Sequence, residues 1–250
     1  LSLNLNQELL NSSSLISSLE NRLINLRLEL AVLKRQFIDQ GAPEIIYKES
    51  EIEELKKQIQ TINPDIVFHL AAQPLVVNSY KDPVGTWETN VMGTINVLES
   101  IRSLNKNCTG IFITTDKVYK NNEWVFGYRE NDELGGYDPY SSSKAACEIA
   151  ISSWRSSFDL YQRNNNSNFS IASARAGNVI GGGDWSENRI IPDLIKAIHN
   201  TYPLEVRNPN STRPWQHVLE PLSGYLILAQ KLFLNGDEFA EAWNFGPKDE

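Results

Sequence analysis

The first part of the chain carries apolar residues at heptad spacing. Between residues 9 and 37 they occupy every place of a three-four repeat except Ser12, at Leu9, Ile16, Leu19, Leu23, Leu26, Leu30, Leu33 and Phe37. About four heptads of this kind predict either a coiled coil or a long amphipathic helix packed on the body of the protein. The pattern leaves both open. Gly41 and Pro43 then end the helix, so a first unit is predicted over residues 1–40.

Beyond residue 50, short apolar runs alternate with longer amphipathic segments. "SEIEELKKQIQTI" predicts a surface helix, which makes residues 41–62 a connector that ends in a helix. Strands are then predicted in "DIVFHL", "GIFITT" and "SIASARA", with helices over residues 84–104 and from Tyr140 onward. Such alternation is typical of βαβ units in a parallel sheet. We therefore expect an α/β domain over residues 63–250.

Composition and charge narrow the class of protein. The chain is 41% hydrophobic and 22% charged, as in soluble globular proteins, and its net charge of −8 argues against a nucleic-acid partner. Two cysteines, Cys108 and Cys147, and three widely separated histidines do not have metal-site spacing. An apolar run of membrane-spanning length is absent, so we expect no membrane contact and a cytoplasmic location. The chain begins at Leu1 and its one methionine is Met92, which suggests a fragment.

The predicted strand ends contain the residues that are candidates for binding and catalysis. Parallel sheets bind ligands at the carboxyl ends of their strands, here residues 69–73, 114–117 and 175–178. In the helix that follows the second strand, Tyr140 and Lys144 share one face. At about 5 Å and an effective dielectric near 20, the ammonium and the phenolate would attract by roughly 3 kcal/mol. That would lower the tyrosine pKa toward about 7–8 and make it a general base. The spacing alone is weak evidence, because it occurs by chance in many helices.

Six stretches in order make the pattern specific. They are "HLAAQPLV", "TNVMGTINVLE", "TTDKVY", "YDPYSSSKAACE", "RAGNVIGGGDW" and "RNPNSTRPWQHVLEPLSGYL". Together they resemble the extended short-chain dehydrogenase/reductase family, and within it the sugar-nucleotide 4,6-dehydratases that use CDP-glucose. The resemblance, from about Ile62 to Pro247, implies an incomplete Rossmann-like parallel sheet with flanking helices and a partial substrate domain. It also implies NAD as cofactor, CDP-glucose as the nucleotide-sugar substrate, and a homo-oligomer.

The resemblance implies catalytic roles for five residues. Thr115, Tyr140 and Lys144 would form the oxidoreductase trio, in which Tyr140 takes the proton of the sugar 4-hydroxyl. Asp116 would protonate the leaving 6-hydroxyl, which requires a pKa raised by desolvation. Lys117 stands where many relatives have glutamate. It would act either as a base with a depressed pKa or as a cation that stabilises the enolate, and the sequence leaves both open.

The resemblance also assigns binding residues. Small side chains allow the backbone to approach the cofactor, so the cofactor-binding set is His69, Ala71, Ala72 and Gln73 together with Tyr140 and Lys144. Arginines bind a diphosphate in bidentate fashion, and the substrate-binding set is Asn178, Arg189 and Arg213. Trp215 and His217 are expected to be packing residues beside Arg213.

The chain departs from the family at its start. A glycine-rich turn after the first strand should hold the NAD pyrophosphate, yet the first 84 residues contain one glycine, Gly41. Losing two or three charge-assisted hydrogen bonds would cost about 3–9 kcal/mol of binding. Three hypotheses follow: a working dehydratase, an inactive remnant that associates through its N-terminal helix, or a sugar-nucleotide 4-epimerase. An epimerase needs no acid to expel a hydroxyl, so Asp116 argues against it.

Overall fold

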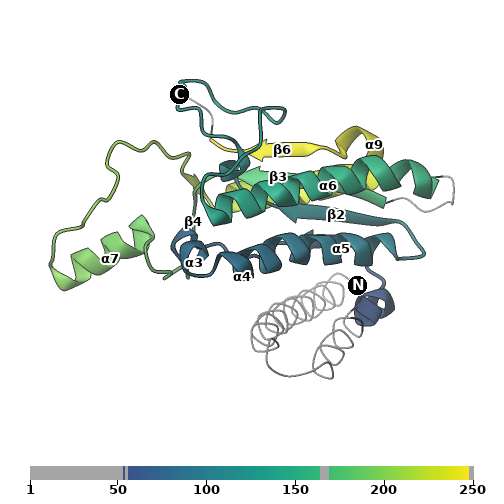
Figure 1. Ribbon diagram of the computed structural model, residues 1–250, viewed down its shortest axis with the longest axis horizontal. Helices are drawn as coiled ribbons and strands as arrows, with labels where there is room; N and C mark the ends of the chain where they lie inside the picture. The colour runs from purple at the N-terminus through teal and green to yellow at the C-terminus, as the bar shows by residue number, and fades with distance from the viewer. Residues whose placement is uncertain (1–52, 54–55, 164–168, 248–250) are drawn as a thin grey trace, which may run out of the picture.

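The computed structural model describes residues 53, 56–163 and 169–247. These residues form one parallel sheet with helices against both of its faces (Figure 1). The heptad-patterned unit over residues 1–40 lies outside the described residues. Of the connector, residues 56–62 are described and are helical, as the sequence predicts. In the described part, no helix is both long and apolar enough to cross a membrane.

The main sheet has four parallel strands. They are β1 (Ile66–His69), β2 (Cys108–Ile113), β3 (Phe169–Ala176) and β6 (Ala242–Phe245), in the order β1-β2-β3-β6. The register sets Ile66 beside Thr109 and Cys108 beside Phe169. Because neighbouring strands run in the same direction, each connection must lead from the carboxyl end of one strand back to the amino end of the next. The predicted α/β fold with a parallel sheet is confirmed.

Helices form the crossover connections. The first holds α3 (Val76–Lys81), α4 (Pro83–Trp87), the π-helical turn η1 (Glu88–Met92) and α5 (Gly93–Arg102). The helix predicted over residues 84–104 is therefore present, with a π-helical turn inside it. The second crossover contains the short 3₁₀ turn η2 (Asp116–Val118) and the long helix α6 (Pro139–Arg163).

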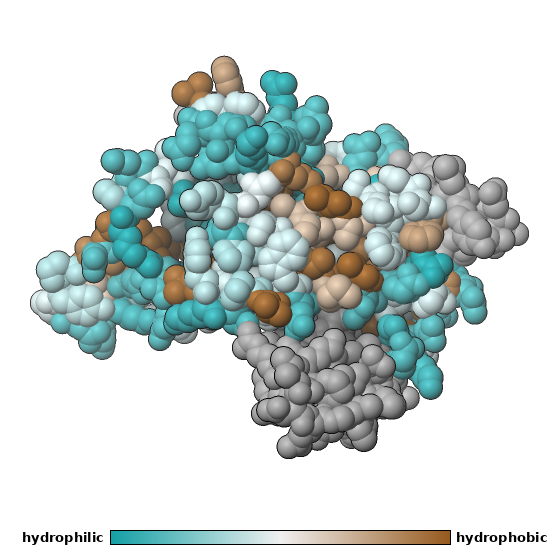
Figure 2. Space-filling view, viewed as in Figure 1, coloured by the Kyte–Doolittle hydropathy of each residue, from teal (hydrophilic) through white to brown (hydrophobic). Residues whose placement is uncertain are grey.

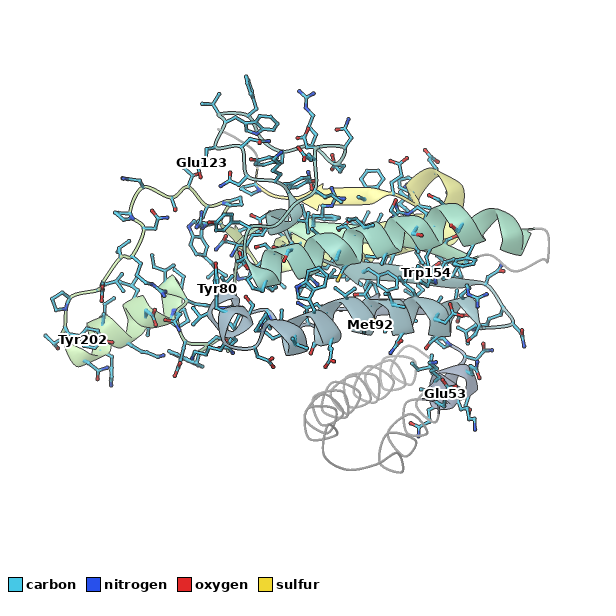
Figure 3. The ribbon with its side chains drawn as sticks, viewed as in Figure 1. Glu53, Tyr80, Met92, Glu123, Trp154 and Tyr202 are labelled. Atoms are coloured by element: carbon cyan, nitrogen blue, oxygen red, sulfur yellow. The ribbon has the colours of Figure 1, made fainter. Side chains whose placement is uncertain are left out.

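The third crossover is longer and was not resolved into elements by the sequence pattern. It contains β4 (Val179–Ile180), α7 (Ile190–Asn200), β5 (Gln216–His217), α8 (Leu219–Leu234) and α9 (Gly236–Phe239). Strands β4 and β5 pair with each other as a separate two-stranded sheet. Helix α7 stands away from the main sheet, with Tyr202 just beyond its end (Figure 3).

The core lies on both faces of the main sheet. Alternate strand residues point to opposite faces, so Phe112 and Ile171 pack with α5 and α6, whereas Ile111 and Ala172 pack with α8. All four side chains are almost fully buried. Burial on both faces explains why these strands are continuous apolar runs in the sequence.

We expect Leu98→Ala to lower the free energy of unfolding by about 2–5 kcal/mol, because it empties a site in a close-packed core. Leu98 is fully buried on α5 and belongs to the core beneath α5 and α6. The change is measured by urea unfolding. As a control, Val125→Ala at an exposed position between η2 and α6 should shift stability by about 0.5 kcal/mol or less. Equal losses in the two variants would contradict the assignment of the core.

Candidate active site

The carboxyl ends of β1, β2 and β3 meet at one edge of the main sheet. Because the strands are parallel and adjacent, the residues after His69, Ile113 and Ala176 come together there. Thr115 follows β2 in an extended conformation, and its side chain accepts a hydrogen bond from the Lys117 backbone NH at 3.4 Å. This bond caps the 3₁₀ turn η2, whose first residue is Asp116.

The start of α6 delivers Tyr140 to this edge. Asp138 caps the helix, since its carboxylate accepts hydrogen bonds from the Ser141 NH at 3.0 Å and the Ser141 hydroxyl at 2.6 Å. Pro139 occupies the first helical position, where its missing NH costs nothing. Gly136 passes so close that a Cβ on it would lie 2.1 Å from the Ser141 carbonyl carbon. A glycine is therefore required for this segment to reach the helix N-terminus.

Tyr140, Thr115 and Asp116 form a connected polar run. The Thr115 side chain acts on the Tyr140 phenol, and the Thr115 hydroxyl donates to the Asp116 carboxylate at 3.0 Å. Burial raises the pKa of Tyr140 to about 12, and the effect of Thr115 opposes this. The charges of Asp116, Asp138 and Arg189 also act on the phenol.

The lowered tyrosine pKa predicted from the Tyr140–Lys144 spacing is not found. Lys144 is buried, and its ammonium donates to the Ile113 carbonyl at 2.8 Å. Burial lowers the pKa of Lys144, against the charges of Cys147 and Glu148, which raise it. The sequence argument failed because it counted the attraction between the two groups and left out the cost of removing both from water.

Asp116 has the property expected of a general acid. Its carboxyl is largely buried, and this burial raises its pKa, whereas Thr115, Lys117 and Arg213 act in the opposite direction. Lys117, by contrast, is exposed. A lysine base needs desolvation, which Lys117 does not receive from the described residues.

The residues predicted to bind the diphosphate lie on the third crossover. Arg189 precedes α7 and pairs with Asp184 at 2.7 Å, and Arg213 is exposed. Both act electrostatically on the site, Arg189 on Tyr140 and Arg213 on Asp116. Gly177 permits this approach after β3, because a Cβ there would lie 2.3 Å from Pro214 Cγ.

Asn178, Trp215 and His217 lie in and beside the small sheet of β4 and β5. Asn178 is half-buried and its carbonyl accepts from the Gln216 NH at 3.0 Å, so β4 and β5 hold it next to the strand end. Trp215 and His217 are exposed rather than packed, because β5 lies at the surface. Their assignment as packing residues is wrong.

The predicted cofactor segment after β1 is tied down by its own hydrogen bonds. The Gln73 amide group contacts the Leu75 backbone and the Thr86 hydroxyl, so its side chain stabilises the loop. His69 is buried with its ring edge against Phe112, at 5.6 Å between centroids. Ala71 and Ala72 are half-buried. The backbone of this segment, more than its side chains, is what a ligand could approach.

Sequence reasoning missed Asn90. This buried amide accepts from the Gln73 NH at 2.8 Å and donates to the Ser143 hydroxyl of α6 at 2.8 Å. It thereby joins the loop after β1 to the helix that carries Tyr140. The signal was present as a polar residue inside an otherwise buried helical stretch, but its partners are distant in sequence.

The described residues fit one end of an NAD molecule better than the other. Thr115, Tyr140 and Lys144 meet at the strand end, as the reacting end of the cofactor requires. In residues 56–163 and 169–247 the first glycine is Gly85, inside α4, and no strand of the sheet precedes β1. A glycine turn that would hold the pyrophosphate therefore does not occur in this part of the chain.

Known proteins resemble this chain in sequence over most of its length. The family model described as GDP-mannose 4,6 dehydratase matches residues 37–236. CDP-glucose 4,6-dehydratase of Salmonella typhimurium is 51% identical over 200 residues, which cover 80% of this chain and 56% of that enzyme. A dTDP-D-glucose 4,6-dehydratase of Dictyostelium discoideum is 29% identical over 73% of this chain and 41% of that enzyme. The chain thus spans about half the length of these curated relatives.

Solved structures resemble the fold. UDP-glucuronic acid 4-epimerase of Bacillus cereus, in complex with UDP-glucuronic acid and NAD, superposes with a TM-score of 0.62 at 24% identity. The match covers 78% of this chain and 57% of that one. Epimerase Mth375 of Methanothermobacter thermautotrophicus superposes with a TM-score of 0.65 at 25% identity, over 78% of this chain and 55% of that one.

We expect Asp116→Asn to raise the melting temperature by a few degrees at pH 7. The folded-state pKa of Asp116 is raised, so its contribution to stability is fully present below the unfolded pKa of about 3.9 and is lost as pH rises through the folded pKa. At pH 7 the buried carboxylate therefore destabilises the fold. Thermal unfolding between pH 4 and 8 should show the gain of the variant shrinking toward pH 4.

The matched control is Asp65→Asn, which removes an exposed carboxylate paired with Lys106. It should show no such gain at pH 7. A gain for Asp116→Asn that is the same at every pH would contradict the raised pKa.

Proposed function

Because the chain belongs to the GDP-mannose 4,6-dehydratase family, within the extended short-chain dehydrogenases/reductases, we propose that it acts as a CDP-glucose 4,6-dehydratase. The proposal takes its substrate from the relative with 51% identity. The observation that carries it is the run of polar side chains from Tyr140 through Thr115 to Asp116, in which Thr115 acts on the Tyr140 phenol and donates a hydrogen bond to Asp116. This run sets an acid beside the residues that would oxidise and reduce the sugar.

NAD+, when bound, would supply the oxidation of the sugar at C4 and, from the hydride so stored, the reduction at C6 that leaves C4 as a ketone. Tyr140 would take the proton of the 4-hydroxyl, and Thr115, which acts on the Tyr140 phenol, would orient that hydroxyl. Lys144, held by the Ile113 carbonyl, would lie beneath them as a fixed cation. The raised pKa of Tyr140 favours its protonated form, so a positive charge brought by the ligand is needed to make it a base at neutral pH.

Elimination would use the other end of the run. A 4-ketone acidifies the C5 proton, and loss of that proton expels the 6-hydroxyl. Asp116 would protonate the leaving oxygen, because burial keeps its pKa raised. Lys117, next to Asp116 and exposed in the unliganded chain, would be covered by the bound sugar and would then take the C5 proton. The ammonium so formed would stabilise the enolate as a cation. Arg189 and Arg213, with Asn178, would hold the diphosphate.

A 4-epimerase is the second candidate, because both solved structures described above are epimerases. The two activities differ in one measurable way. A dehydratase releases water from the sugar, whereas an epimerase leaves its mass unchanged. The raised pKa of Asp116 supports the dehydratase, since epimerisation does not expel a hydroxyl.

We expect Tyr140→Phe to reduce turnover of CDP-glucose by about 10²–10⁴-fold, because the phenol oxygen is the base. Asp116→Asn should reduce water loss more than it reduces oxidation at C4. Mass spectrometry of the product, with NAD+ supplied, measures the loss of water. Full activity in Tyr140→Phe, from protein whose fold is intact, would refute the assignment.

Calorimetric titration with NAD+, with and without CDP-glucose, tests whether the chain still holds the cofactor. Binding in the micromolar range would support the dehydratase. Folded protein that gives no heat would instead support the inactive remnant, which kept its reacting residues and lost its oxidant.

We further propose that the chain forms a homo-oligomer through the outer side of α5 and α6. Apolar atoms gather over these two helices (Figure 2), and the exposed apolar residues nearby include Met92 and Ile149. The heptad-patterned residues 9–37 offer an alternative surface. Both fit association of identical chains, and the two surfaces are separable by substitution.

Met92→Glu with Ile149→Glu should lower the mass measured by light scattering if α5 and α6 form the interface. Leu23→Glu with Leu30→Glu should lower it if the heptad segment does. Both changes set charges into an apolar contact, which is costly. A monomer mass in the unmodified chain would refute both surfaces.

A further inference from the structure

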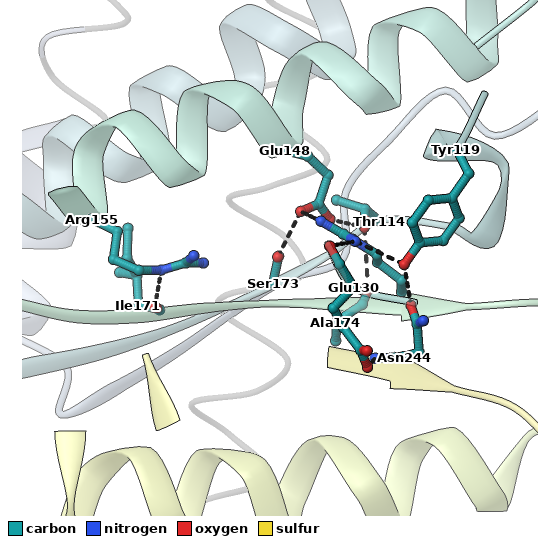
Figure 4. A network of polar contacts seen from close by, with 10 residues as sticks. Thr114, Tyr119, Glu130, Glu148, Arg155, Ile171, Ser173, Ala174 and Asn244 are labelled. Carbon is teal, nitrogen blue, oxygen red and sulfur yellow. Dashed lines mark hydrogen bonds and ion pairs between the residues drawn. The ribbon is translucent and has the colours of Figure 1, made fainter. Parts of the chain in front are cut away.

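A network of buried polar groups lies beneath the candidate active site (Figure 4). Its centre is an ion pair between Glu148 of α6 and Arg175 of β3, with 2.8 Å between Oε2 and Nη2. Their side chains are 2% and 4% exposed. Glu148 lies one helical turn after Lys144, so the pair is directly below the predicted trio.

The Glu148 carboxylate is fully engaged by donors from two strands. The Thr114 hydroxyl, at the end of β2, donates to Oε1. The Ser173 hydroxyl, in β3, donates to Oε2 at 2.8 Å, beside the Arg175 guanidinium. One side chain of α6 is thus bonded to both central strands at their carboxyl ends.

Arg175 extends the network to the far edge of the sheet. Its Nη1 donates to the Tyr119 hydroxyl at 2.8 Å and to the Glu130 carbonyl at 2.9 Å, and its guanidinium carbon lies 5.1 Å from the Tyr119 ring centre. The Tyr119 hydroxyl in turn donates to Asn244 of β6 at 2.6 Å. The segment that follows η2 is thereby fastened to β3 and β6.

An ion pair is not needed here for stability alone. Two charges are costly to remove from water, and an apolar pair of similar size would hold a helix on a sheet equally well. The hydrogen-bonded ion pair adds a defined orientation of α6 on the sheet, because charge-assisted hydrogen bonds form in few geometries. Moreover, Thr114 precedes Thr115, and Lys144 bonds the carbonyl of Ile113, next to Thr114.

We propose that Glu148 and Arg175 are positioning residues that set α6 in register on β2 and β3, so that Tyr140 and Lys144 meet Thr115. The proposal concerns residues that do not touch the substrate and act through the trio. The negative charge of Glu148 also raises the pKa of Lys144 against the effect of burial, which favours the ammonium form. The part of its test that measures turnover rests on the proposed dehydratase function.

The test uses the full chain and three variants: Glu148→Gln, Arg175→Met and the double variant. Each single change leaves one buried group without its ionic partner, so each should lower thermal stability. The double variant removes both charges and should recover most of that loss. If the pair positions the trio, kcat should nevertheless fall about ten-fold or more in all three, with KM for CDP-glucose changed less than about two-fold.

Amide hydrogen exchange supplies a readout that does not depend on turnover. In the double variant, peptides that cover residues 113–119 and 140–148 should exchange faster than in the unmodified chain, while peptides from α5 do not change. Glu99→Gln is the matched control, since it removes an ion pair with Arg102 on α5, away from the trio. It should change neither kcat nor exchange in these two segments.

The outcomes separate the two proposals. If the unmodified chain shows no turnover, the dehydratase proposal fails, and faster exchange in the double variant still supports the positioning role. If the double variant recovers stability together with normal kcat, or with normal exchange where turnover is absent, the pair is merely structural and the positioning proposal is overturned.

Discussion

The packing of α6 across β2 and β3 is the constraint on which the rest of this structure depends. The helix buries Cys147 and Ile151 against the sheet and brings Tyr140, Lys144 and Glu148 to the carboxyl ends of the strands. Its N-terminus is held by Asp138 and by the close approach of Gly136. A shift of one residue along the helix would rotate all three polar groups away from Thr115, since successive side chains are about 100° apart.

Burial, more than attraction between charges, sets the protonation of the candidate site. It raises the pKa values of Tyr140 and Asp116 and lowers that of Lys144, so each group is moved toward its neutral form. For Asp116 this suits a general acid. For Tyr140 it means that the protein alone does not prepare a base, and that a bound cation would have to contribute.

The relation to the family is uneven along the chain. Among the described residues, the second crossover carries Tyr140 and Lys144, and the third carries Arg189 and Arg213. The described residues do not contain the glycine turn that holds a dinucleotide. The geometry of the site does not depend on the part of the chain that would hold the cofactor's pyrophosphate. The hydrogen bonds that position the trio join α6, β2 and β3 and involve no residue before β1.

The sequence by itself determined the parallel α/β fold and the residues at the strand ends. Those signals are local: apolar runs mark strands buried on both faces, and Tyr140, Lys144, Thr115 and Asp116 occur in short motifs. It did not reveal the third crossover, because β4, β5 and α9 are too short to show a period. Only the tertiary structure decided the pKa of Tyr140, the exposure of Lys117 and the bonds of Glu148 and Arg175. The bonds of Glu148 join residues 25 or more positions apart, and the pKa of Tyr140 depends on the loss of water, neither of which spacing along a chain encodes.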